Sequence, residues 1–343
     1  MIINGKPYRT VWTEDGAVKT INQSLLPGSF EIVTLRDYRE VIVAIRDMIV
    51  RGAPAIGAMG AYGLAMAINQ MDDHDMDRIH TIKKELEQAR PTANDLSHGL
   101  NYLFDNLQPA NTIDEMKAAA AMAAQSYADR SVEACRLIGT IGNELIKDGD
   151  RILTHCNAGA LATVDYGTAL AVIRRAHYDR KSIYVYVDET RPRLQGLKIT
   201  AWELLQEGIP HAIIADNAAG YFMQQGEIDI VITGADRVAV NGDAANKIGT
   251  YEKAVLAKEN GIPFYIAAPL ATIDFHCPSG DKIPIENRDA AEILMIDGKR
   301  IAPQGSQAKN PAFDVTPAKY IRGIITEKGI FKPGDIRVLE KNA

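Results

Sequence analysis

The sequence predicts an α/β fold, in which a smaller, mostly helical N-terminal domain precedes a domain built on a parallel sheet. From residue 151 onward, apolar runs of four to six residues alternate with segments of helical periodicity, the pattern of a parallel sheet covered by helices. Before that point, apolar residues recur mainly at helical spacing. We expect the two domains to span residues 1–120 and 121–343.

The N-terminal domain is expected to begin with a short extended segment of about 25 residues, with a turn at Glu14, Asp15 and Gly16. Helical spacing of apolar residues follows, as in Val41, Ile45, Met48 and Ile49. The helices expected here cover residues 38–50, 55–68, 76–89 and 114–147.

The C-terminal domain is expected to hold the sheet. Its nearly continuous apolar strands predict a sheet that is covered on both faces. The expected strands are 151–154, 183–187, 212–215, 228–232 and 264–267, and the expected helices are 166–175, 199–206 and 250–260. After Pro303 we expect loops and a short closing element.

Composition excludes several classes of protein. A net charge of -6, from 38 basic and 44 acidic residues, argues against a nucleic-acid partner. No uncharged apolar stretch approaches ~18 residues, and the start of the chain lacks a signal-peptide pattern, so we expect a cytoplasmic protein without a membrane partner. The cysteines Cys135, Cys156 and Cys277 form no CxxC, and the histidines show no ligand spacing, so no metal and no cofactor are expected.

Polar residues gather where the predicted strands end. His155, Cys156 and Asn157 follow the first strand, and Asp236 follows the fourth in the segment TGADR. Ligands bind beyond the carboxyl ends of strands in open parallel sheets, so the thiol of Cys156 and the carboxyl group of Asp236 can share one pocket. Similar polar groups end the other two strands: Asp188, Glu189, Thr190, Arg191 and Arg193, then Asp216 and Asn217.

Two glycine-containing turns are candidate anion sites. One, at residues 157–160, is expected to open a helix after the first strand, and the other is Arg51-Gly52-Ala53 with Pro54 in the following helical turn. Arg51 adds a forked cationic contact. Each turn is also compatible with an ordinary, tightly packed helix start.

The single residues also keep a structural alternative. Cys156 fits either a small buried side chain or a thiolate favoured by a helix N-terminus. Asp236 fits a helix cap, although the strand-like pattern that follows it weakens this interpretation. Lys247 and Gln195 are equally compatible with a surface position.

Five motifs occur in order along the chain: RGAPAIG (51–57), ARPTAND (89–95), THCNAGALAT (154–163), DETRPRLQG (188–196) and TGADRVAVNGDAANKIGTY (233–251). Together they closely resemble the methylthioribose-1-phosphate isomerase family of methionine salvage. That family is related to the regulatory subunits of the eukaryotic initiation guanine-nucleotide exchange factor. The resemblance covers nearly the whole chain, and the last two motifs are the most specific.

The resemblance implies a helical domain followed by a Rossmann-like domain, in a homodimer. It implies that the family's catalytic aspartate is Asp236 and its catalytic cysteine Cys156. Its phosphate and sugar contacts fall on Arg51, Gly52, Ala53, Arg90, Gln195, Asn246 and Lys247. The partner is then a small sugar phosphate, converted from 5-methylthioribose 1-phosphate to 5-methylthioribulose 1-phosphate.

The chemistry needs an acid for the ring oxygen and a group that deals with the hydrogen on C2. We expect Asp236, kept protonated in an apolar pocket, to be the acid, and Cys156 to be the base or the group that stabilises the transition state. Proton abstraction and hydride shift both remain open. The alternatives are an isomerase of 5-deoxyribose 1-phosphate or ribose 1,5-bisphosphate, with Arg191 and Arg193 as candidate contacts of a second phosphate, and a non-catalytic regulatory subunit. A nucleotide-dependent dehydrogenase is disfavoured, because CNAGALAT departs from GxGxxG.

Overall fold

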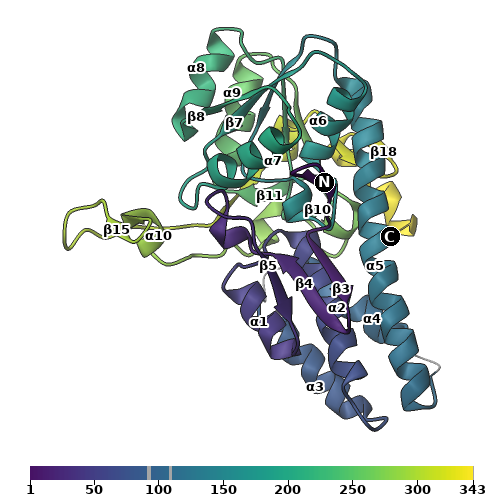
Figure 1. Cartoon of the computed structure of the whole chain (residues 1–343). Helices are drawn as coiled ribbons and strands as arrows, with labels where there is room; N and C mark the ends of the chain where they lie inside the picture. Colours follow the sequence, from purple (N-terminus) through teal and green to yellow (C-terminus); the bar gives the residue numbers. More distant parts are fainter. Residues whose placement is uncertain (91–93, 108–109, 343) are drawn as a thin grey trace.

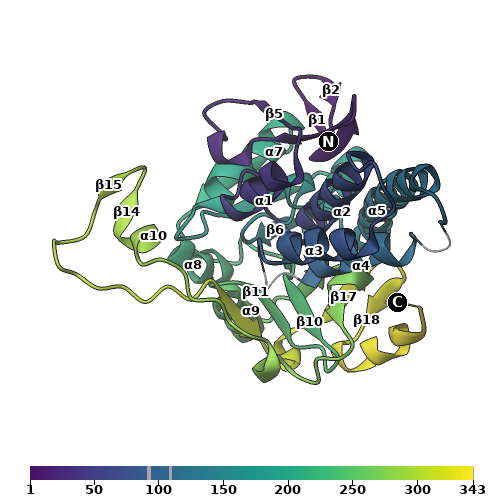
Figure 2. The ribbon, with the colours of Figure 1, turned by 90° about the horizontal axis from the view of Figure 1, so that it is seen from below.

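The computed structural model describes residues 1–90, 94–107 and 110–342. The N-terminal elements form one layered body, and the large sheet with its helices forms another, while the long helix α5 (Ile113–Gly142) runs along both (Figure 1). An arm that carries α10 (Ala291–Leu294), β14 (Met295–Ile296) and β15 (Lys299–Arg300) projects from the body in both views (Figures 1 and 2).

The chain begins with small antiparallel sheets. The hairpin β1 (Ile2–Ile3) and β2 (Lys6–Pro7) precedes a sheet of order β3-β4-β5, formed by Val11–Glu14, Ala17–Ile21 and Ile32–Leu35. Asp15 and Gly16 make the tight turn between β3 and β4, with φ of 52° and 74°, as two-residue hairpins require. The expected turn is therefore confirmed, and the extended start is longer than expected.

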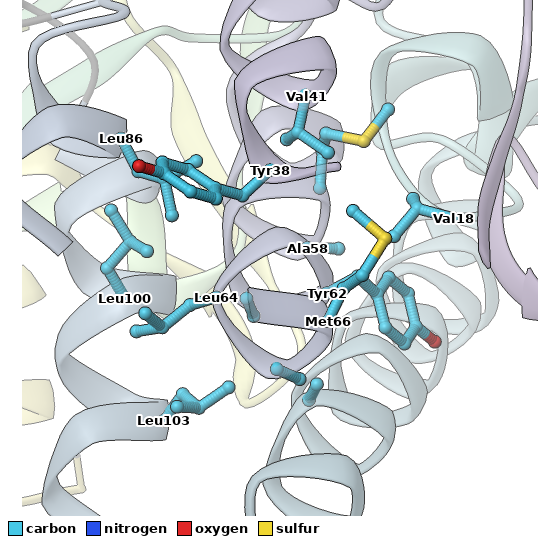
Figure 3. Packing of buried hydrophobic residues seen from close by; sticks show 14 of the residues in the cluster. Val18, Tyr38, Val41, Ala58, Tyr62, Leu64, Met66, Leu86, Leu100 and Leu103 are labelled. Atoms are coloured by element: carbon cyan, nitrogen blue, oxygen red, sulfur yellow. The ribbon is translucent and has the colours of Figure 1, made fainter. Parts of the chain in front are cut away.

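Helix α2 (Ala53–Asn69) is the centre of the N-terminal core. All residues from Ala55 to Ile68 are buried, which is typical of a helix surrounded by other elements. Figure 3 shows Tyr62 and Met66 on the side of Val18, and Leu64 on the side of Leu100 and Leu103. The surrounding helices are α1 (Tyr38–Arg46), α3 (Met76–Glu87), α4 (Asn94–Asp105) and α5.

Helix α5 joins the two bodies. Met116 and Tyr127 belong to the N-terminal core, whereas Ile138 packs against the large sheet. The expected division at residue 120 lies inside this helix. The domain boundary therefore stays a prediction.

The large sheet has the order β18-β17-β12-β9-β6-β7-β8, parallel except for the antiparallel edge strand β18. Strand order runs one way from β6 to β8 and the other way from β9 to β17, so β6 and β9 flank the topological switch point. The strands are β6 (Arg151–Thr154), β7 (Tyr184–Asp188), β8 (His211–Ile214), β9 (Ile230–Thr233), β12 (Phe264–Ala267), β17 (Gly323–Thr326) and β18 (Gly329–Phe331).

The predicted α/β fold class is confirmed. All five expected strands form, within two residues at each end, and the helices between them are α6 (Ala169–Tyr178), α7 (Ala201–Gln206), α8 (Ala219–Gln224) and α9 (Thr250–Glu259). The prediction that loops and a short closing element follow Pro303 is wrong. This part of the chain forms β17 and β18, which complete the large sheet. No helix in the described part of the chain is both long and apolar enough to cross a membrane.

A second sheet, of four strands, supplies residues of the candidate site described below. Its order is β13-β10-β11-β16, formed by Ile273–Asp274, Arg237–Ala239, Ala244–Lys247 and Phe313–Thr316. The hairpin of β10 and β11 begins directly after Asp236, and its second strand carries two further predicted site residues, Asn246 and Lys247.

Candidate active site

Cys156 and Asp236 lie at the switch point of the large sheet. Cys156 follows β6 by two residues and Asp236 follows β9 by three, and these two strands are paired, with Leu153 opposite Val231. Both residues line one pocket of about 650 Å³. The structure therefore brings together the two groups that the strand-end argument placed in a common site.

Every other predicted site residue lines the same pocket. They come from the start of α2, the segment before α4, the segment after β7 and the end of β11. These residues are Arg51, Gly52, Ala53, Arg90, Gln195, Asn246 and Lys247. Their assembly from four distant segments is a structural fact, whereas their individual roles stay predictions. Of the motif at 89–95, residues 91–93 lie outside the described residues.

The backbone at Cys156 is held in an unusual conformation. Its φ is 61°, a region that non-glycine residues rarely adopt. Thr190 Oγ1 accepts a hydrogen bond from the Cys156 N–H at 2.8 Å, and Thr200 Oγ1 donates to the Cys156 carbonyl at 2.6 Å. Such conformations persist where surrounding contacts enforce them, often at functional sites.

The electrostatics of Cys156 differ from the expectation. Burial raises the pKa of the thiol above its usual value, and the positive charges of Lys247 and Arg51 offset this only in part. The thiolate that we expected from a helix N-terminus is therefore not the favoured resting form. Burial also lowers the pKa of Lys247 to about 8.

The turn before α2 is open to the pocket. Arg51, Gly52, Ala53 and Pro54 all line it, and no side chain of the described residues caps the helix, whose first turn has amide groups available to an anion. Gly52 has a φ of 93°, and a Cβ there would lie 2.3 Å from the carbonyl oxygen of Ala162. The turn thus requires glycine for both conformation and space.

The second predicted anion turn, at residues 157–160, is already filled. The carboxylate of Glu203, 1% exposed, accepts hydrogen bonds from the amides of Ala160 and Leu161 at 2.8 and 3.2 Å. It also pairs with Arg174 at 2.6 Å. The prediction that this turn opens an α-helix is wrong, because only the short 3₁₀ turn Ala160–Ala162 follows and α6 begins at Ala169.

Glu203 also orients Arg51. Asn157 donates from Nδ2 to Glu203 at 2.9 Å, which turns its Oδ1 toward Arg51 Nη2 at 2.6 Å. Among the described residues, Arg51 Nε and the buried Gln195 Oε1 have no hydrogen-bond partner. Unpaired buried polar atoms in a pocket are positions for a polar ligand.

Sequence reasoning missed Arg288 and Phe313, which also line the pocket. The ring of Phe313 lies between two cations, with Lys247 Nζ at 4.4 Å and Arg288 Cζ at 5.4 Å from its centroid. Neither residue stands at an end of a predicted strand, so no signal in the sequence marked them. Arg51, Arg90 and these two cations line this pocket together with Asp236, so its surroundings here are cationic and not the apolar pocket that we expected.

A second hollow of about 490 Å³ adjoins the first, and Ala53, Arg90, Asp236 and Phe313 line both. The remaining lining is mostly aliphatic, apart from Arg237. It consists of Ile56, Arg237, Ala245, Ile283, Pro284 and Ile285. A polar, cationic pocket therefore continues into a mainly apolar compartment.

Other strand-end residues point elsewhere. Arg193 forms an ion pair with Glu292 of the arm at 2.9 Å, and Arg191 donates to the carbonyl of Ile293 at 3.0 Å. A group that the sequence did not predict, His155, Asp188 and Asp216, has ligand atoms within 4.8 Å of one another. The ammonium of Lys253 lies 2.9 Å from Asp188 and occupies the place of a cation there.

The fold and the pocket define an α/β protein with a cationic pocket that a carboxyl group and a thiol both line. The chain belongs to the Initiation factor 2 subunit family, which it matches over residues 49–333. It is 53% identical to the methylthioribose-1-phosphate isomerase of Acetivibrio thermocellus, over 93% of this chain and 95% of that protein. The isomerase of Natranaerobius thermophilus is 47% identical, over 95% and 96%.

Two solved structures show the same architecture. The 5-methylthioribose 1-phosphate isomerase from Pyrococcus horikoshii has a TM-score of 0.91 at 44% identity, covering 98% of this chain and 96% of that one. The translation initiation factor eIF-2B subunit delta from A. fulgidus has a TM-score of 0.86 at 40% identity, covering 97% and 99%. The likeness therefore extends to an isomerase and to an initiation-factor subunit.

Proposed function

We propose that this protein converts 5-methylthioribose 1-phosphate to 5-methylthioribulose 1-phosphate. The observation that carries the proposal is the convergence of Cys156 and Asp236 at one switch point, in a pocket with an open helix N-terminus and several cations. The relatives named as methylthioribose-1-phosphate isomerases support it, because they match nearly the full chain at about half identity.

The phosphate binds at the start of α2. Backbone amides and the helix dipole favour an anion there, and Arg51 and Lys247 add charge from two sides. The unpaired Arg51 Nε is free to complete a forked contact. Arg90, Gln195 and Asn246 then hold the sugar.

The reaction begins at the ring oxygen. With the substrate bound, Asp236 acts in its protonated form and gives its proton to that oxygen as the bond between C1 and the ring oxygen breaks. Hydrogen moves from C2 to C1, and the hydroxyl on C2 loses its proton as the carbonyl forms. A proton returned to Asp236 restores the site, so the net change is an isomerisation.

The raised pKa of Cys156 distinguishes between the two roles that we expected for its thiol in the reaction. A thiol that is neutral at rest is a poor base for a proton on carbon, and it can stabilise the transition state as a hydrogen-bond donor. This favours the second of the two expected roles and a hydride shift over proton abstraction. Retention of deuterium from C2 in the product supports this route, and wash-out into water excludes it.

The aliphatic compartment takes the 5-substituent. Ile56, Ile283, Pro284 and Ile285 suit a methylthio group and disfavour a second phosphate. The arginines considered for that phosphate, Arg191 and Arg193, contact the arm instead. Ribose 1,5-bisphosphate is therefore the weaker substrate candidate. 5-Deoxyribose 1-phosphate, whose 5-substituent is also apolar, is a stronger alternative to 5-methylthioribose 1-phosphate.

A non-catalytic regulatory subunit is the alternative from another class. The structural similarity to an initiation-factor subunit supports this alternative, because fold similarity alone does not distinguish an enzyme from a regulatory subunit. The presence of Cys156 and Asp236 in the pocket favours the enzyme. We further propose that the protein is cytoplasmic, since its three cysteines are free thiols, as is usual in a reducing compartment. We also propose that it forms a homodimer.

The test compares three sugars with the purified protein: 5-methylthioribose 1-phosphate, 5-deoxyribose 1-phosphate and ribose 1,5-bisphosphate. We expect the highest kcat/KM for the first. Asp236→Asn and Cys156→Ser should fold normally and lose turnover by about 10²–10⁴-fold. Binding without turnover of any sugar would instead identify a regulatory subunit.

A further inference from the structure

A cluster of buried charged side chains lies next to Cys156 but outside the pocket lining. His155, Asp188 and Lys253 are each at most 1% exposed. Asp188 Oδ2 lies 2.6 Å from His155 Nδ1 and 2.9 Å from Lys253 Nζ. None of these residues has a part in the isomerisation as described above.

The hydrogen bonds of His155 define its protonation. Its Nε2 lies 2.9 Å from the carbonyl oxygen of Ile248, and a carbonyl only accepts, so Nε2 carries a hydrogen. Asp188 also faces the ammonium of Lys253 and is therefore a carboxylate, which accepts from Nδ1. The ring donates from both nitrogens and carries a positive charge.

The ring joins two segments that supply the pocket. His155 precedes Cys156 after β6, and Ile248 follows Lys247 after β11. The backbone at Gly249 makes room for the ring, because a Cβ there would lie 3.1 Å from His155 Cε1 at a φ of 99°. The hydrogen bond from His155 to Ile248 thus links the segment that carries Cys156 directly to the segment that carries Lys247.

We propose that His155 is a positioning residue for the isomerisation: its imidazolium fixes the Cys156 segment to the Lys247 segment, so that thiol and ammonium face one substrate. This proposal rests on the proposed function of the pocket. The charged groups around His155 are Asp188 of β7, Lys253 of α9, Asp216 after β8 and Asp314 of β16.

The first experiment measures steady-state kinetics of His155→Asn with 5-methylthioribose 1-phosphate. We expect kcat to fall about 10- to 100-fold, since a displaced reactive group costs that much, while KM changes less than about threefold. His155→Gln, whose amide can still donate to Ile248, should recover part of kcat. His211→Asn is the matched control, because that ring contacts only Ile209 of its own loop in the described hydrogen bonds.

The second experiment needs no isomerase activity. Iodoacetamide alkylates Cys156 selectively, because Cys135 and Cys277 are buried. We expect His155→Asn to slow this alkylation about tenfold at pH 8 and to shift its midpoint to higher pH, because the Cys156 thiolate loses its fixed position beside the cation of Lys247.

The two readouts separate the two proposals. A protein inactive on all three sugars overturns the proposed function, and altered alkylation in His155→Asn then still supports the link between His155 and Cys156. A folded His155→Asn variant with wild-type alkylation overturns the positioning role, whatever its kcat. If this variant does not fold by circular dichroism, the same criterion applies to His155→Gln.

Discussion

The two glycine turns that flank the pocket look alike in sequence and differ in the structure. The turn at Arg51-Gly52-Ala53 presents free amides of α2 to the pocket. The turn at residues 157–160 gives its amides to the carboxylate of Glu203. The anion interpretation is confirmed for the turn at residues 157–160, where the anion belongs to the protein, and it stays a prediction for the turn at Arg51-Gly52-Ala53.

This difference assigns separate tasks to the turns. The filled turn is a structural unit that fixes Asn157 and, through it, the guanidinium of Arg51. The open turn is the place that we propose for the phosphate of the substrate. A glycine turn therefore indicates an anion, and only the fold shows which one.

The largest expected effect comes from emptying the filled turn. Glu203→Gln removes the nearer of the two carboxylate charges that pair with Arg174, which is also the charge that the two amides face, so we expect the free energy of unfolding to fall by about 3–5 kcal/mol. Urea unfolding measures it. Glu207→Gln is the control, since Glu207 pairs with the same Arg174 at 2.8 Å but bonds to neither amide, and its loss should be smaller. Equal losses would contradict the special role of the turn.

The next largest effect comes from the open turn. Arg51→Gln should lower kcat/KM by about 10²–10³-fold, because it removes the fixed cation beside the phosphate, with little change in stability. Arg51→Lys keeps a charge without the fork and should recover part of the loss. Arg46→Gln, an exposed residue at the end of α1, serves as control. An unchanged Ki of inorganic phosphate in Arg51→Gln would place the phosphate elsewhere.

The sequence predicted the sheet better than its edges. In β9, Ile230, Val231 and Ile232 are consecutive apolar residues and all are buried, and burial on both faces makes such runs recognisable. The strand β17 was missed, although Gly323 to Thr326 are all buried, because it follows a long irregular segment that hides the alternation of strands and helices. Pairing with β12, which lies more than fifty residues earlier, decides its conformation.

The shared location of Cys156 and Asp236 could be predicted from the strand ends, whereas long-range contacts could not be predicted. Cys156 and Asp236 could be placed together because parallel strands bring their carboxyl ends to one edge. Glu203 could not be found, since a helical glutamate more than forty residues from the turn has no local pattern. Arg288 was missed for the same reason.

Helix geometry at the open turn gives a third prediction. Gly52→Ala places a Cβ 2.3 Å from the carbonyl oxygen of Ala162 at a φ of 93°, so we expect roughly 2–4 kcal/mol of lost stability, together with a raised KM. Gly149→Ala is the matched control, with a φ of 89° and no atom within 4 Å, and should cost about 1 kcal/mol. Thermal unfolding of both variants measures the difference, and equal costs would show that close packing at Gly52 is unimportant.

Glu203 also contrasts with Asp95, a buried carboxyl group whose two oxygens lack hydrogen-bond partners in the described structure. Burial, and secondly the charge of Asp236, raise the pKa of Asp95 to about 7. Its folded pKa lies above the unfolded value, so its contribution to stability is present below about pH 4 and is lost as the pH rises to about 7. Asp95→Asn should therefore gain about 1–3 kcal/mol at pH 8 and little at pH 4. A gain of the same size at both pH values would contradict this account.

The smallest expected effect concerns Lys247, a cation of the pocket whose pKa burial lowers to about 8. The amides of α2 do not titrate, whereas Lys247, with a pKa of about 8, loses its charge as the pH rises further. We expect kcat/KM to fall about fivefold between pH 8 and 9, and kcat to fall less, because bound phosphate favours the ammonium. Lys247→Arg keeps its charge over this range and should remove that decline, even if it binds less tightly. If Lys247→Arg showed the same decline of kcat/KM between pH 8 and 9, another group would cause that decline. Phosphate binding at α2 would then depend on Arg51 and the backbone amides, without Lys247.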